Sequence, residues 1–539
     1  HYQTETHAIS HYNKYFNEPP VIAPPSGSTW QEYLGLSTPF NSQYFPMFQS
    51  LGISNYAFRN NAPQNYRAAY IVLEDNATKL VGKHELQFGF HVRYNQSNQL
   101  PQQWFAEGIH NASSAATSVY DPVASTPTNP VPLGKTGHEL ANLFIGVLNY
   151  QNQLNRGWYN LRERDYALYI NDTYKVTPRL TVNIGLRWEY WPVLTEKDNI
   201  LATYDPNTKS VVLGQPLDTL YSKLVTVPSV VARYQELGAK FAYWKDVGFP
   251  KELMTGSKGD FGPRVGFAYR VGDGKKAFVV RGGYSLSYYP IPQTRWMDYD
   301  RGNVPFNANF VYNMNSAAQT PDGLPNWTIR SAPHVIAGVN SRDVITFDQP
   351  QGISRGSGGM QYFGPDQPTS RVHQWNLTIE KEVMQYTAAR VRYVGNHGAN
   401  LEQFYAYNNN PTDYIWYVTR GVPKPTGEYA PVAMRPFDNT TFGTLNEFRK
   451  TGYSNFSGME FEIDRRYYKG VAFQLAYVVG NTLATTLSNQ GSVGSVHDFL
   501  PGAVPEDFDK RNRFLTYRRD TGIPKHRVKW NFLVDLPFG

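Results

Sequence analysis

The chain has 539 residues with a formal net charge of +7; 15% of its residues are aromatic and 18% are charged. It contains no cysteine, which excludes a disulfide framework and a thiolate site. The positive charge is small and dispersed, with no basic run of the kind that binds nucleic acid. The sequence has no stretch of about 18 apolar residues, so it predicts no transmembrane helix. The residues after His1 do not form the basic and then apolar segment that marks a signal peptide. Many Tyr, Asn and Gly residues favour a β-protein with large polar loops.

Residues 1–65 are rich in Pro, Asn, Tyr and Ser without a sustained period, and we predict a long extracellular loop region there. Beyond it, apolar and polar residues alternate in paired stretches, the period of strands with one apolar and one polar face. The clearest stretch is 180–190, where Val182, Ile184 and Leu186 share the apolar face with Trp188 and Tyr190. The predicted hairpins span residues 66–94, 165–190, 264–289, 372–394 and 458–479, and a last single strand spans 527–536.

One unit recurs along the chain: strand, tight turn, strand, long connection. Residues 137–148 predict a short amphipathic helix inside one connection. Soluble sandwiches have mostly short connections at both ends, whereas outer-membrane barrels combine short periplasmic turns with long extracellular loops. The asymmetry therefore predicts an all-β fold, an antiparallel transmembrane β-barrel. A soluble protein of several sandwiches that binds carbohydrate is the alternative.

Several of these stretches also resemble a known family. They read DYALYINDTYKVTPRLTVNIGLRWEY (165–190), KHELQFGFHVR (83–93), GPRVGFAYR (262–270), VVRGGYSLSYY (279–289), QWNLTIEKEV (374–383), RVRYVGNHGANL (390–401) and IPKHRVKWNFLVDLPFG (523–539). Together they resemble the barrel of Oar-like TonB-dependent outer-membrane receptors, in the same order and over nearly all of residues 40–539.

This resemblance implies a barrel of about 22 strands, filled by a plug domain that the TonB complex pulls on. About 11 strands are predicted here, so we expect residues 66–539 to be a partial barrel, a fragment that lacks the plug and the first strands. The partners implied are outer-membrane lipid, an unknown extracellular ligand, and the TonB complex acting through a plug outside this chain. The implied location is the outer membrane of a Gram-negative type of cell.

No constellation for catalysis or metal binding stands out. A dense charge cluster lies at Glu506, Asp507, Asp509, Arg511 and Arg513, but it lacks the glycine-containing spacing of a calcium loop. We interpret it as a solvated loop base with local ion pairs. The histidines His91, His373 and His497 have no partner at metal-ligand spacing. We therefore expect no enzyme activity, no metal and no cofactor.

A ladder of opposite charges is predicted on the inner wall. Arg390 and Arg392 precede a long connection, and Glu460, Glu462 and Asp464 follow it. The two strands should be antiparallel neighbours, which places these charges opposite one another. The simpler interpretation is cross-strand pairing that stabilises the wall. The sharper one is a track that contacts the plug or a polar substrate.

Aromatic residues in the predicted loops are candidate substrate-binding residues. They are Trp104, Trp158, Trp244, Trp296, Trp327 and Trp416. Flat aromatic faces beside Asn and Gln suit sugars or peptides. We favour the structural interpretation, because large loops need small cores of their own.

The sequence thus predicts a TonB-dependent receptor that imports a large nutrient, with an oligosaccharide or a peptide favoured. A passive porin-like barrel is one alternative. A surface adhesion or interaction protein anchored by the barrel is another.

Overall fold

The structure is a computed structural model. It describes residues 2–17, 33, 47–49, 64–100, 109–126, 131–153, 158–223, 225–256, 259–292, 296, 303–306, 309–312, 358–364, 367–406, 442–485, 495–496 and 517–536.

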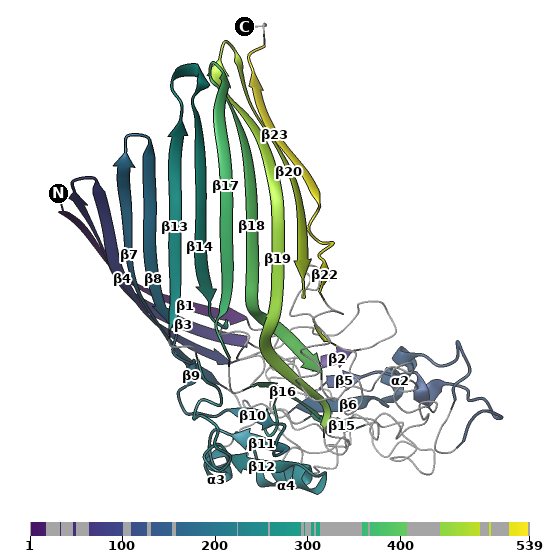
Figure 1. The fold of residues 1–539 in the computed structure, drawn as a ribbon. Helices are drawn as coiled ribbons and strands as arrows, with labels where there is room; N and C mark the ends of the chain where they lie inside the picture. The colour runs from purple at the N-terminus through teal and green to yellow at the C-terminus, as the bar shows by residue number, and fades with distance from the viewer. Residues whose placement is uncertain are drawn as a thin grey trace, which may run out of the picture.

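Twelve long strands of the described chain form one antiparallel meander in which each strand pairs with the next. They are β1 (Tyr2–Asn17), β3 (Gln64–Val81), β4 (His84–Leu100), β7 (Tyr159–Thr177), β8 (Leu180–Tyr190), β13 (Asp260–Val271), β14 (Phe278–Tyr289), β17 (Ser370–Met384), β18 (Thr387–Ala406), β19 (Phe442–Tyr468), β20 (Val471–Ala484) and β23 (His526–Val534). In Figure 1 they lie side by side in a curved sheet, with tight turns at one end and the long connections at the other.

All five predicted hairpins are confirmed, and their turns are short. Between β19 and β20, Lys469 and Gly470 have φ angles of 52° and 78°. Positive φ at both central residues is the backbone of a type I′ turn, whose twist matches that of the flanking strands. The strands continue past the predicted hairpins at the loop end, where β7 already begins at Tyr159. This end carries the connections that hold the candidate site.

The prediction of a loop over residues 1–65 is wrong for its first part. Tyr2–Asn17 forms β1, which pairs with β3 along its whole length, from Tyr2 opposite Lys79 to Asn17 opposite Gln64. The segment lacks the strict alternation of apolar and polar residues that marks the later strands, because polar and aromatic residues occur at both odd and even positions of its sequence. The sheet therefore has one more strand at its N-terminal side than the sequence predicted.

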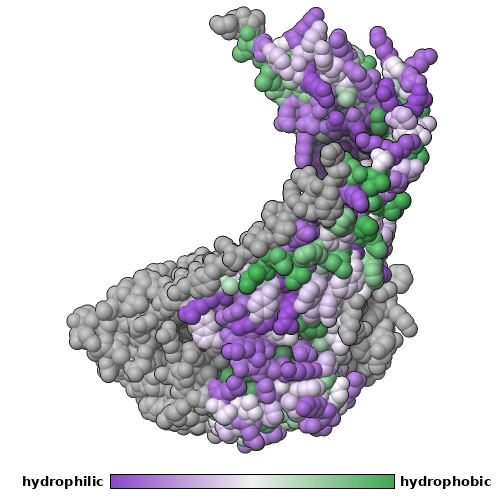
Figure 2. Space-filling view, turned by 90° about the vertical axis from the view of Figure 1, so that its left-hand side faces the viewer, coloured by the Kyte–Doolittle hydropathy of each residue, from purple (hydrophilic) through white to green (hydrophobic). Residues whose placement is uncertain are grey.

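The outer face of the sheet is apolar and exposed. Ile184, Trp530 and Phe532 are 59%, 64% and 73% exposed, and cross-strand pairs such as Val391 with Phe461 repeat the pattern. Figure 2 shows hydrophobic residues gathered in a band across the strands, with hydrophilic residues toward both ends. An exposed apolar band of this extent is the lipid-facing surface of a membrane barrel and excludes a soluble sandwich.

Small elements cover the loop end of the sheet (Figure 1). One module combines a three-stranded sheet with two helices, and its strand order is β10-β11-β12. Its elements are β10 (Ala202–Asp205), β11 (Ser210–Leu213), β12 (Lys240–Tyr243), α3 (Leu217–Ser222) and α4 (Pro228–Glu236). A second sheet is formed by β2 (Met47–Gln49), β5 (Ile109–Asn111), β6 (Asn149–Gln153) and β15 (Asn309–Tyr312).

The predicted helix within residues 137–148 is confirmed as α2 (Glu139–Ile145), which packs Leu140 and Leu143 against Phe48 and Leu148. The remaining short elements are η1 (Ala115–Thr117), β9 (Thr195–Glu196), η2 (Gly274–Lys276), β16 (Gly358–Phe363), β21 (Ser495–Val496) and β22 (Arg518–Arg519). Among the described residues, every helix is too short or too polar to cross a membrane.

Candidate functional site

The predicted charge ladder is present on the inner face of β18 and β19. Arg390 lies opposite Glu462 and Arg392 opposite Glu460 in the strand register. Arg390 Nη1 donates to Glu462 Oε1 at 3.1 Å, and Arg392 Nη1 donates to Glu460 Oε2 at 2.9 Å. Asp464 Oδ2 lies 3.9 Å from Arg390 Nη1. The structure therefore brings together all five residues that the sequence placed in the ladder.

The ladder extends beyond the five predicted residues. Glu380 on β17 accepts from Arg390 Nε at 3.1 Å and from Arg281 Nη1 on β14 at 2.8 Å. On the other side, Gln474 on β20 donates to Glu462 Oε1 at 2.7 Å. Asn531 on β23 donates to Gln474 at 3.5 Å.

Polar side chains thus connect six neighbouring strands on one face. Arg281, Glu380 and Gln474 could have been predicted to face the inner wall, because each lies on the polar face of its alternating strand. The pairings are electrostatic and structural in kind: half-buried cross-strand ion pairs contribute about 0.2–1 kcal/mol each.

A pocket lies at the loop end of the sheet, where several connections meet. Its walls come from Trp191–Leu194 after β8, Met254–Gly256 before β13, Pro290 and Ile291 after β14, and Gln367–Thr369 before β17. Trp296 also lines it. The cavity measures about 60 Å³, several times the space that one water needs. A pocket with mostly apolar walls and a few polar groups is the usual form of a small-molecule site.

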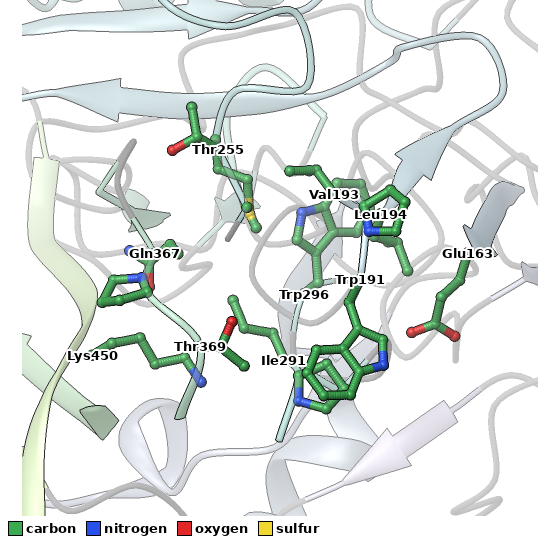
Figure 3. A pocket seen from close by; sticks show the side chains of 15 residues that line it. Glu163, Trp191, Val193, Leu194, Thr255, Ile291, Trp296, Gln367, Thr369 and Lys450 are labelled. Carbon is green, nitrogen blue, oxygen red and sulfur yellow. The ribbon is translucent and has the colours of Figure 1, made fainter. Parts of the chain in front are cut away.

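Two charged side chains enter the pocket from opposite sides (Figure 3). Lys450 extends from β19, and Glu163 extends from β7 beyond Trp191. The Lys450 side chain is 1% exposed, and its Nζ donates to Ser370 Oγ at 2.9 Å and to Glu402 Oε1 at 3.3 Å. It lies outside the apolar band of β19, which begins near Met459. Loss of water around the ammonium lowers the pKa of Lys450, and the Glu402 carboxylate opposes this shift.

Gln367 is the other buried polar residue of the pocket. Its Nε2 donates to the Gly364 carbonyl at 2.9 Å and to the Phe448 carbonyl at 3.2 Å. Its Oε1 is buried and accepts no hydrogen bond from the described residues. No pattern in the sequence pointed to Gln367 or Lys450, because they are brought to the same pocket only by the fold.

The predicted loop aromatics divide into three groups. Trp296 belongs to the buried core at the loop end, and Trp244 packs against that core. Both residues therefore pack in the loop-end core, and Trp296 in addition lines the pocket. Trp158 is half-buried under the Arg67 guanidinium, which lies 5.2 Å from its ring centre. Trp104, Trp327 and Trp416 lie outside the described residues.

The other candidates form no chemical centre in the described part of the chain. His91 Nδ1 lies 3.1 Å from Glu74 Oε2, and His373 Nδ1 lies 2.8 Å from the Tyr284 hydroxyl. The cluster from Glu506 to Arg513 and His497 lie outside the described residues. Among those that are described, no three His, Asp or Glu side chains are placed to hold a metal ion.

The apolar outer face and the charged inner wall together define an outer-membrane β-barrel protein. The chain belongs to the outer membrane beta barrel domain family, whose model matches residues 7–539. No curated protein sequence matches it.

Solved structures similar to this chain are outer-membrane proteins of low sequence identity. The outer membrane transporter YddB from Escherichia coli is 9% identical with a TM-score of 0.43, over 90% of this chain and 43% of that one. The ferripyoverdine receptor of Pseudomonas aeruginosa is 10% identical with a TM-score of 0.35, over 89% of this chain and 38% of that one. The ferric yersiniabactin uptake receptor FyuA from Yersinia pestis is 10% identical with a TM-score of 0.33, over 89% and 42%. The chain spans about two fifths of the length of these structures.

Proposed function

We propose that the chain is the partial barrel of a TonB-dependent outer-membrane receptor of the Oar-like type, which imports a large nutrient. The observation that carries the proposal is the charged inner wall. Polar side chains connect β14, β17, β18, β19, β20 and β23 on the face away from lipid. A wall of this kind suits a wet lumen or a polar domain held against it.

In this proposal the loop end captures the ligand and the lumen carries it inward. The loop end, which lies at the opposite end of the sheet from the tight turns (Figure 1), holds a pocket of mostly apolar walls and few polar groups. A plug domain would contact the charge ladder, and the TonB complex would move the plug. The cargo is an oligosaccharide or a peptide, and the energy comes from the inner membrane, so the chain itself performs no chemistry.

Uptake by whole cells tests this proposal. Cells that make the receptor are given fluorescent peptides and oligosaccharides, with and without TonB and with and without a protonophore. We expect receptor-dependent accumulation that is lost when either TonB or the proton gradient is removed. Accumulation that persists without TonB would establish a passive porin instead. If deletion of the receptor abolished cell attachment and left uptake unchanged, the protein would be an adhesion protein instead.

A further inference from the structure

The outer face of β7 carries cations without carboxylates at its loop end. Leu168 lies in the apolar band and is 55% exposed. Arg164 and Arg162 follow on the same face, because residues two positions apart in a strand share a face. Glu163 and Asp165 lie on the inner face, and each has a polar partner there. Strand alternation therefore separates the two arginines from both neighbouring carboxylates.

A third guanidinium group joins these two from β3. Arg162 Nη1 donates to Asn98 Oδ1 at 3.0 Å, and Asn98 lies directly opposite Arg67 in the strand register. Arg67 and Arg164 are exposed, and their guanidinium groups lie 5.2 Å and 6.0 Å from the centres of aromatic rings. None of the three arginines forms an ion pair with a described residue. This arginine cluster, formed by Arg67, Arg162 and Arg164, gathers like charges that an anion would stabilise.

The position of the arginine cluster along the strands matches the depth of lipid head groups. At the edge of the apolar band, the Tyr190 ring centre lies 6.0 Å from that of Tyr166 and 6.1 Å from that of Trp188. The cluster follows this aromatic row toward the loop end. Apolar, then aromatic, then cationic is the order in which a barrel strand passes from hydrocarbon to the interface. A planar guanidinium group there can bind phosphate with two parallel hydrogen bonds.

The same order recurs on β17 and β18. Leu377 in the apolar band is followed by Trp375, His373 and Arg371 at alternate positions of β17. His397 on β18 lies opposite His373, and the two ring centres are 5.9 Å apart. Two separate places at the loop end of the outer face thus carry basic residues just beyond an aromatic one.

The tight-turn end of β7 differs in its charges. Asp172 lies two positions beyond Ile170 on the outer face, and its Oδ2 is 2.7 Å from His84 Nδ1. An acidic residue therefore accompanies the basic one at that end. The long connections of an outer-membrane barrel are extracellular, so the arginine cluster meets the outer leaflet of the membrane.

We propose that the arginine cluster binds a phosphate group on a lipid of the outer leaflet. The acyl chains of this lipid lie along the apolar band beside Leu168 and Ile170, which are 55% and 54% exposed, and its phosphate contacts the arginines. A lipid gains from both contacts, whereas a free phosphate ion gains from the arginines alone and is screened by salt. The inference goes beyond the proposed import function, because it depends only on a sheet that spans the membrane.

Lipid binding by the purified protein tests this inference. The protein is extracted from outer membranes and exchanged into dodecyl maltoside micelles that contain lipid A, a diphosphorylated glycolipid. Native mass spectrometry then measures the fraction of the protein that carries the lipid. We expect replacement of the whole cluster, by Arg67→Gln, Arg162→Gln and Arg164→Gln together, to weaken binding about tenfold.

Two controls accompany this variant. The combined substitutions Arg179→Gln, Arg264→Gln and Arg270→Gln remove the same charge from exposed positions outside the cluster, and this protein should bind lipid A as the wild type does. The wild type should also bind dephosphorylated lipid A about tenfold more weakly than lipid A. This second comparison needs no substitution, so it tests the proposal even if a variant does not assemble.

Three results contradict the proposal. Equal binding of lipid A with and without its phosphates overturns it. So does an equal loss of binding in both variants, because net charge alone would then attract the lipid. Displacement of lipid A by inorganic phosphate at the same concentration would assign the cluster to a free anion and overturn the lipid assignment. The assay contains no TonB and no energy source, so import and lipid binding fail separately.

Discussion

The inner wall and the loop-end pocket are built in opposite ways. The wall is polar and regular, and the charged residues of the ladder pair across neighbouring strands, as Arg390 does with Glu380 and Glu462. The pocket is apolar and irregular, and its residues come from connections far apart in sequence. The wall depends on strand register, so it tolerates the loss of one pair. The pocket depends on close packing, so it is sensitive to each large side chain.

The largest expected effect breaks the packing at the loop end. Trp296 is 5% exposed and belongs to the core behind the pocket, so Trp296→Ala should lower the free energy of unfolding of this region by about 3–5 kcal/mol. Hydrogen exchange should show the loss in β10–β12 and at the loop end of β19, where Phe448 belongs to the same core, and not in β17 or β20. The matched control is Trp158→Ala, which removes a half-buried ring under Arg67. An equal loss in both variants would mean that Trp296 is not a core residue.

A second variant reverses one charge of the wall. In the wild type, Arg390 Nη1 lies 3.1 Å from the Glu462 carboxylate. Glu462→Lys replaces this carboxylate with a second cation beside Arg390. We expect it to lower uptake several-fold while the barrel still assembles, as judged by heat-modifiable migration in gels. Glu382→Lys near the turn end of β17 is the control and should leave uptake unchanged. Unchanged uptake in Glu462→Lys would reduce the ladder to a structural role.

A smaller effect concerns the buried ammonium of the pocket. Burial lowers the pKa of Lys450 from its usual 10.5. Between that lowered value and 10.5, the unfolded chain binds more protons than the folded one, so stability rises with pH across this window. Melting temperatures from pH 8 to pH 10.5 should therefore rise more, or fall less, in wild type than in Lys450→Met. Parallel pH profiles would show that the ammonium is hydrated in the folded protein.

The smallest expected effect is the removal of one exposed pair. Arg392→Ala breaks the contact with Glu460, but the Arg392 side chain is 38% exposed and water screens the pair. We expect a loss of about 0.2–1 kcal/mol, measured by urea unfolding in detergent. A loss as large as that of Trp296→Ala would contradict the distinction between wall and pocket.

The sequence predicted the wall well because one rule governs it. Period-two alternation assigns Arg390 and Glu462 to the same face, and antiparallel pairing of β18 with β19 brings the two residues together. The same rule failed at Tyr2–Asn17, where the sequence shows no regular alternation of apolar and polar residues. It also missed Arg281 and Glu380 as members of the ladder, since their pairing needs the register of two further strands.

The pocket was beyond sequence reasoning for a physical reason. Gln367 and Lys450 are 83 positions apart in the sequence, and no period relates them. They line one pocket because β17 and β19 both begin at the loop end of the sheet, where the connections pack against one core. Trp296 was predicted as a loop aromatic. Its position in the buried core could be recognised only from its neighbours in the fold.

The most direct test of this account compares two adjacent residues of β18. Arg392 faces the inner wall and Tyr393 the outer face, and the chain has no natural cysteine to interfere. Nitroxide labels are attached to the Arg392→Cys and Tyr393→Cys variants in lipid nanodiscs, and their relaxation by oxygen and by a water-soluble nickel complex is measured. We expect oxygen, which is concentrated in lipid, to relax the label at 393 more strongly than nickel does, with no such preference at 392. Equal preference at both positions, or the reverse, would contradict a barrel with a lipid-facing outer surface and a charged inner wall.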